Sequence, residues 1–148
     1  MSWKDLVTEE NVKKILNDFS DFEKSNNKPI VKLSVQELAG MIDHTLLKQD
    51  ATFSEIKQLC EEAMRFNFAS VCVNPSYVES CFKLIKSSNV KVCTVIGFPL
   101  GATTTQVKTL ETQEAIKNGA EELDMVINIG RLKDRDYDFI FNDIKTIA

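Results

Sequence analysis

The sequence lacks any apolar run that approaches the ~20 residues needed for a membrane-spanning helix. Its first residues, Met1–Asp5, also lack the basic and apolar regions of a secretory signal. No cluster of basic residues is present and the formal net charge of the 148-residue chain is −4, so nucleic acids and acidic membranes are poor partners. Together these absences predict a cytoplasmic protein whose partner belongs to another chemical class.

Metal-binding residues are scarce or badly spaced. His44 is the only histidine, and no two cysteines stand at the CxxC spacing of a zinc site, so we expect no metal site. A hydrogen-bonded structural role is favoured for His44 over a role as base or ligand. The four cysteines lie within predicted helices and strands, where buried free thiols are favoured over disulfides. These cysteines are Cys60, Cys72, Cys81 and Cys93.

What the sequence does contain is a regular alternation of strand and helix patterns from Met41 onward. Capping patterns that begin at Thr52, Asn74 and Thr103, and apolar residues at helical spacing in 137–148, predict a helix after each strand. Short segments of almost continuous apolar character predict the strands at residues 41–47, 70–73, 90–96 and 122–128. This alternation indicates an α/β fold in which helices cover a parallel sheet.

The segment that precedes the alternation is more polar. Apolar residues at helical spacing predict a helix within Thr8–Phe22, and a capping box that begins at Ser34 predicts a short helix through Ala39. We therefore divide the chain into a helical N-terminal extension, residues 1–33, and a main domain, residues 34–148.

Two architectures share this alternation: an open doubly wound sheet and a closed (β/α)₈ barrel. Periodicity alone does not separate them. Four strand–helix units make half of a barrel, whose typical length is ~250 residues. In both architectures ligands bind at the carboxyl ends of the strands and in the loops that follow them. That rule selects residues 43–48, 73–74, 97–105 and 124–130.

Two carboxylates stand inside strand patterns that are otherwise apolar, at Asp43 and Asp124. A buried carboxylate costs several kcal/mol unless it is paired or its proton is used, so both are candidate acids or bases. The alternative is a hydrogen-bonded core role. Lys48 follows the first strand, where a solvated loop lysine is favoured over a Schiff-base lysine. The loop Gly97–Gly101 is interpreted as a turn before a capped helix, in preference to an anion site.

Four segments closely resemble the deoxyribose-phosphate aldolase family, in its order and at its spacing: Ile42–Lys48, Ser70–Pro75, Val95–Gly101 and Glu122–Gly130. The resemblance covers about residues 38–148. It implies a parallel (β/α) barrel of TIM type, of which this chain holds about the first four units. It also implies reversible cleavage of 2-deoxy-D-ribose 5-phosphate to glyceraldehyde 3-phosphate and acetaldehyde through a lysine Schiff base, without metal or cofactor.

The resemblance also implies roles for individual residues. Asp124 matches the aspartate that donates and accepts protons, and Asp43 matches an aspartate that supports the active-site network. Thr45, Cys72 and Asn128 are expected to contact the substrate, a small phosphorylated sugar or aldehyde. The alternative interpretation of Cys72 is a thiol packed in the core.

By the same resemblance, the Schiff-base lysine and its partner lysine lie on later strands, beyond Ala148. Loss of a covalent nucleophile abolishes nearly all catalysis, so we expect a truncated chain that is inactive alone. A half-barrel should expose two unpaired edge strands and an apolar inner face, which predicts a homo-oligomer or association with a missing C-terminal half. The alternatives are a non-catalytic half-barrel that dimerises or pairs with a full-length paralogue, and an unrelated doubly wound binding domain.

Overall fold

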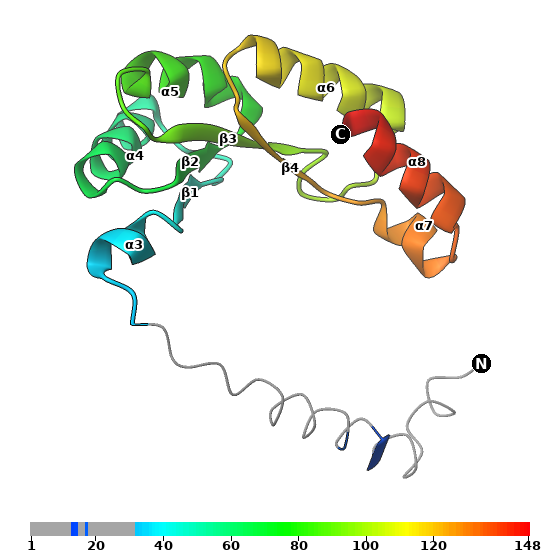
Figure 1. Cartoon of the computed structure of the whole chain (residues 1–148). Coiled ribbons are helices and arrows are strands. Elements are labelled where there is room, and N and C mark those ends of the chain that lie inside the picture. Colours follow the sequence, from blue (N-terminus) through cyan, green and yellow to red (C-terminus); the bar gives the residue numbers. More distant parts are fainter. Residues whose placement is uncertain (1–12, 15–16, 18–31) are drawn as a thin grey trace. The chain divides into compact units, whose positions relative to one another are not determined.

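The computed structural model describes residues 13–14, 17 and 32–148 (Figure 1). Contacts divide the chain into two units, residues 1–32 and 33–148, and the second is described by itself. Most of the helix predicted within Thr8–Phe22, and most of the predicted extension, lies outside the described residues; residues 13–14 and 17 are helical. Within the described ranges, no helix has both the length and the apolar character to cross a membrane.

A parallel sheet of four strands forms the centre of the second unit. Each strand pairs with the strand that follows it in the chain, so the strand order is β1-β2-β3-β4. A doubly wound sheet would reverse its order at a switch point, and this sheet does not. Consecutive order is that of a (β/α)₈ barrel, which four strands leave open. The strands are β1 (Asp43–Leu46), β2 (Ser70–Val73), β3 (Lys91–Ile96) and β4 (Glu122–Met125).

The helices that follow the strands lie along one side of this sheet (Figure 1). Helix α4 packs on β1 and β2, α5 and α6 pack on β3, and α8 packs on α6. The other face of the sheet is therefore the face that a closed barrel would turn inward. The helices are α3 (Val35–Ala39), α4 (Phe53–Phe66), η1 (Pro75–Tyr77), α5 (Val78–Ile85), α6 (Thr105–Lys117), α7 (Ile129–Lys133) and α8 (Tyr137–Ile147).

Capping residues decide where these helices begin. The predicted capping boxes at Ser34 and Thr52 are both present and start α3 and α4. The cap of α6 is Thr104, whose Oγ1 accepts the Val107 N–H at 3.3 Å, one residue after Thr103, near which the cap was predicted. Asn74 makes no side-chain cap, and the 3₁₀ turn η1 separates it from α5.

The hydrophobic core lies between the sheet and its helices. Alternate strand residues point toward this core, as the period of two requires. Those of β2 and β3 are wholly or almost wholly buried against α4 and α5, and each such side chain contributes about 1.5–3 kcal/mol on burial. The core includes Val71, Val73, Val92 and Ile96 from the strands and Ile56, Cys60, Ala63, Val78, Cys81 and Ile85 from the helices.

A buried ion pair holds α6 and α8 together next to the end of β4. Lys108 Nζ donates to Asp143 Oδ2 at 2.7 Å and to the Val126 carbonyl oxygen at 2.9 Å. Thr105 donates to the other carboxylate oxygen of Asp143 at 2.6 Å. The two charged side chains are 0% and 1% exposed. This network fixes the backbone immediately after β4, and no sequence pattern predicted it.

Candidate active site

The open face of the sheet carries polar residues and thiols. At the amino ends of the strands, Ser70 Oγ donates to Asp43 Oδ1 at 2.6 Å, and Lys91 Nζ donates to Glu122 Oε1 at 2.7 Å. Further along lies a small buried cluster of Cys72, Cys93 and Val95, with Leu47 packed against it. The inner face is therefore only partly apolar, because hydrogen-bonded polar side chains lie at the amino ends of its strands.

Asp124 lies on this face near the carboxyl end of β4, beside two thiols. The Sγ atoms of Cys72 and Cys93 and a carboxylate oxygen of Asp124 all lie within 4.8 Å of one another. The thiols are 3% and 1% exposed, but Asp124 is exposed. The prediction that Asp124 is buried is wrong for this sheet. Its side chain would be buried only if further strands covered the open face opposite it.

The two thiols form a hydrogen-bonded pair whose pKa values move apart. The hydrogen bond to Cys72, then burial and the nearby charges, raise the pKa of the Cys93 thiol. The same hydrogen bond lowers the pKa of Cys72. Both cysteines are free buried thiols, as the sequence predicted.

Asp43 stands at the first residue of β1, on the opposite edge strand from Asp124. It too is exposed, and Ser70 of β2 is its hydrogen-bond partner. Neither aspartate is a buried core carboxylate in this sheet. Asp43 and Asp124 lie on the same face of the sheet but contact different residues. They therefore belong to two separate polar clusters of the site.

The residues predicted to contact the substrate also lie in two separate places. Thr45 pairs in register with Cys72 and donates its hydroxyl to the Asp43 carbonyl oxygen at 2.8 Å. Asn128 lies beyond β4, which ends at Met125 instead of the predicted residue 128. Its Oδ1 accepts the Arg131 N–H at 3.2 Å and caps α7, a helix that the sequence did not predict. Thr45 and Cys72 are thus neighbours in the sheet, whereas Asn128 lies in the segment that joins β4 to α7.

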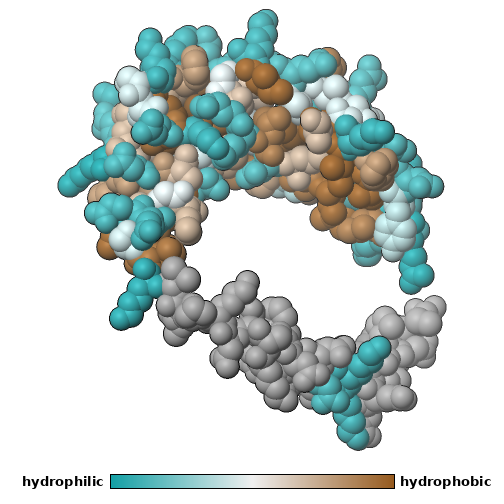
Figure 2. Space-filling view, in the orientation of Figure 1, coloured by the Kyte–Doolittle hydropathy of each residue, from teal (hydrophilic) through white to brown (hydrophobic). Residues whose placement is uncertain are grey.

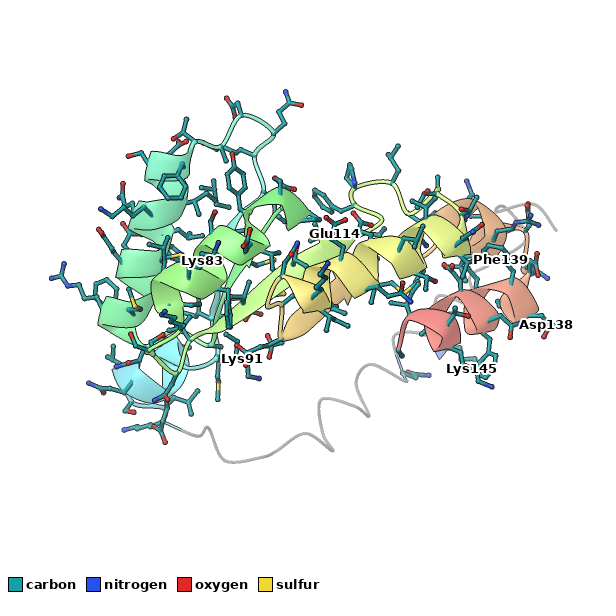
Figure 3. The ribbon with its side chains drawn as sticks, turned by 90° about the horizontal axis from the view of Figure 1, so that it is seen from above. Lys83, Lys91, Glu114, Asp138, Phe139 and Lys145 are labelled. Atoms are coloured by element: carbon teal, nitrogen blue, oxygen red, sulfur yellow. The ribbon has the colours of Figure 1, made fainter. Side chains whose placement is uncertain are left out.

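The lysines of the described residues are poorly placed to form a Schiff base beside Asp124. Lys48 is exposed in the loop after β1, as favoured from the sequence. Lys91 faces the open side, but at the amino end of β3, and it lies well away from Phe139 of α8 (Figure 3). Its hydrogen bond to Glu122 raises its pKa, which opposes the neutral amine that attacks a carbonyl.

His44 points to the helix-covered face, away from these groups. Its Nε2 lies 2.7 Å from Glu62 Oε2 of α4, and its ring lies against that of Phe68, with centroids 5.0 Å apart. The hydrogen-bonded structural role favoured from the sequence is confirmed.

The loop after β3 is a turn that packs against the segment after β4. The Gly101 N–H donates to the Gly97 carbonyl at 2.7 Å, and both glycines have positive φ. A Cβ on Gly101 would lie 2.1 Å from the Ile127 carbonyl oxygen, so only glycine allows the two loops to meet. Glu111 Oε2 accepts the Gly97 N–H at 2.7 Å, so a carboxylate already occupies this donor. The interpretation as a turn before a capped helix is confirmed.

Comparisons with known proteins agree on one family. The family described as DeoC/LacD family aldolase matches residues 38–148. A deoxyribose-phosphate aldolase of Clostridium perfringens is 62% identical over 113 residues, which are 76% of this chain and 50% of that protein. One from Carboxydothermus hydrogenoformans is 56% identical over 116 residues, 78% of this chain and 51% of its own length. The chain spans about half the length of the curated relatives it matches.

Solved structures show the same partial match. A putative deoxyribose-phosphate aldolase from Coccidioides immitis superimposes with a TM-score of 0.75 at 36% identity, over 90% of this chain and 55% of that one. A deoxyribose phosphate aldolase from Aeropyrum pernix, described as having a unique tetrameric structure, gives a TM-score of 0.64 at 32% identity, over 78% and 51%. The four consecutive parallel strands therefore correspond to part of a barrel of TIM type.

Proposed function

This chain belongs to the DeoC/LacD family of aldolases, and from this premise we propose that it supplies the first half of a class I aldolase barrel. The proposed reaction is the reversible cleavage of 2-deoxy-D-ribose 5-phosphate to glyceraldehyde 3-phosphate and acetaldehyde. The observation that carries the proposal is the position of Asp124, an exposed carboxylate near the carboxyl end of β4 on the face that a barrel encloses.

In this reaction a lysine amine adds to the sugar carbonyl and water leaves, giving a protonated imine. The imine accepts the electron pair of the breaking C2–C3 bond while the C3 hydroxyl loses its proton, which releases glyceraldehyde 3-phosphate and leaves an enamine. A proton then adds to the enamine carbon, and water hydrolyses the imine to acetaldehyde. Asp124 is proposed to give and take these protons, and Asp43 to hold the polar network at the other edge. No metal or cofactor takes part.

The nucleophile is proposed to come from the other half of the barrel. Among the described residues, Lys91 is tied to Glu122, Lys108 to Asp143, and Lys48 is a loop residue. The chain alone is therefore proposed to be inactive. Thr45, Cys72 and Asn128 are proposed to contact the phosphorylated substrate, and the four free thiols fit a reducing cytoplasm.

Association is part of the proposal because the sheet is open at both edges. β1 and β4 each pair on one side only within the described sheet, and unpaired strand edges recruit further strands. Hydrophobic residues also gather next to the end of β4 and α7 (Figure 2). Exposed residues of the loop after β3 and of α7 include Phe98, Leu100, Ile129 and Leu132. Such a surface favours pairing with a second half-barrel or a further copy.

Co-expression with the remainder of the Clostridium perfringens relative tests this function. We expect the two polypeptides to co-purify and to release aldehyde from 2-deoxy-D-ribose 5-phosphate, whereas neither polypeptide does so alone. The assay follows glyceraldehyde 3-phosphate through a coupled dehydrogenase. Stable co-purification without cleavage would contradict the aldolase proposal and favour a non-catalytic half-barrel that only binds its partner.

A further inference from the structure

We propose that the open face of the sheet holds a binding site for a thiophilic divalent cation, formed by Cys72, Cys93 and Asp124. Within the described part of the chain, these residues bring two sulfur atoms and one carboxylate oxygen within 4.8 Å of one another. Two thiolates and a carboxylate form a donor set that suits Zn²⁺. The proposal concerns this chain itself and does not depend on the aldolase reaction.

The backbone places the ligands at suitable spacing. Cys72 and Cys93 are direct register partners on β2 and β3, and Asp124 lies on β4, the next strand. With Zn–S bonds of about 2.3 Å, two sulfurs on a tetrahedral ion lie about 3.8 Å apart. Asp124 is exposed, so its side chain has room to change rotamer toward the two sulfurs.

Burial and charge also suit a cation. The sulfurs are almost fully buried while Asp124 is exposed, so an ion can enter from the open face. Binding would release the thiol protons to solvent, and the cation would offset the resulting negative charge in a dry pocket. Three protein ligands leave a fourth position for water, as in open zinc sites. Binding would also occupy the carboxylate proposed for proton transfer.

No local sequence pattern indicates this site, because its ligands come from three strands. The usual zinc signatures place two cysteines on one turn, whereas here only the pairing of parallel strands joins the ligands. The expectation of no metal site rested on that local spacing. The proposal therefore revises it.

The chain contains a matched control. Cys60 of α4 and Cys81 of α5 form a second hydrogen-bonded pair of buried thiols, on the helix-covered side of the sheet. Both are 0% exposed, and they are not part of the three-ligand group. This pair tests whether two buried thiols alone hold an ion.

Titration of the full chain with Co²⁺ under anaerobic conditions, with a phosphine reductant, tests the proposal. We expect a sulfur-to-cobalt charge-transfer band that saturates at a single equivalent and disappears when Zn²⁺ is added. Cys72→Ser and Cys93→Ser should abolish the band. Asp124→Asn, which changes an exposed side chain, should weaken cobalt binding by more than about tenfold, since even outer ligand partners are worth 10–100-fold.

The double variant Cys60→Ala/Cys81→Ala should keep the band and its affinity. Far-ultraviolet circular dichroism of each variant shows whether it is folded, and Asp124→Asn decides the outcome if the cysteine variants are not. The proposal is overturned if wild-type protein gives no band. It is also overturned if the band survives in folded Cys72→Ser or is unchanged in Asp124→Asn.

Discussion

Replacing Asp124 with asparagine is expected to reduce cleavage by the co-expressed halves by roughly 10²–10⁴-fold, the usual contribution of a general acid–base group. The amide has nearly the shape of the carboxylate but does not accept a proton. Because the side chain is exposed at the end of β4, the fold should be unaffected. The loss should fall on kcat, with KM little changed, because proton transfer follows substrate binding.

Asp138→Asn provides the control for this prediction. Asp138 is an exposed aspartate in the first turn of α8 (Figure 3), and its replacement should leave cleavage within about twofold of wild type, as expected for a surface substitution remote from the site. Both assays contain a chelator so that a metal ion on Asp124 does not contribute. An Asp124→Asn complex that retains most of the wild-type kcat would contradict the proton-transfer role.

Lys108→Met is expected to destabilise the chain by about 3–5 kcal/mol, because it leaves the Asp143 charge buried without its partner. It also removes the donor of the Val126 carbonyl, which helps to fix the segment after β4. Urea unfolding followed by circular dichroism measures the free energy. The double variant Lys108→Met/Asp143→Leu should recover most of the loss, because it removes both charges together.

Lys83→Met provides the matched control on the surface. Lys83 pairs with Glu79 on α5, but both side chains are more than half exposed, at 67% and 62% (Figure 3). Solvent screens such pairs, so the expected loss of unfolding free energy is small beside that of Lys108→Met. Equal effects of the two methionine variants would show that the buried network contributes no more than a surface pair.

Local signals in the sequence predicted most of the fold. The strand at Ser70–Val73 has the predicted bounds, because its apolar run ends at Asn74-Pro75. The Ser34 and Thr52 capping boxes started α3 and α4 as expected, since each is complete within four consecutive residues. Helix α7 was missed because the apolar pattern continues through Val126 and Ile127, and only the Asn128 cap turns the chain away.

The predictions that were wrong or missing concern features that depend on residues far apart in the sequence. The expected burial of Asp43 and Asp124 was inferred from their apolar neighbours along each strand. Strand period assigns side chains to a face, but whether that face is closed depends on strands elsewhere. The Lys108–Asp143 pair was not predicted for a similar reason, because Asp143 meets Lys108 only when α8 packs on α6.

We propose that this chain supplies the proton-transfer carboxylate and that the other half of the barrel supplies the lysine. The most direct test is to find which polypeptide carries the Schiff base. The co-expressed halves are incubated with acetaldehyde and borohydride, which reduces an imine to a stable secondary amine, and each polypeptide is then weighed by mass spectrometry. We expect an adduct on a lysine of the partner half and none on this chain. An adduct on Lys48 or Lys91 would contradict it, because the nucleophile would then belong to this half of the barrel.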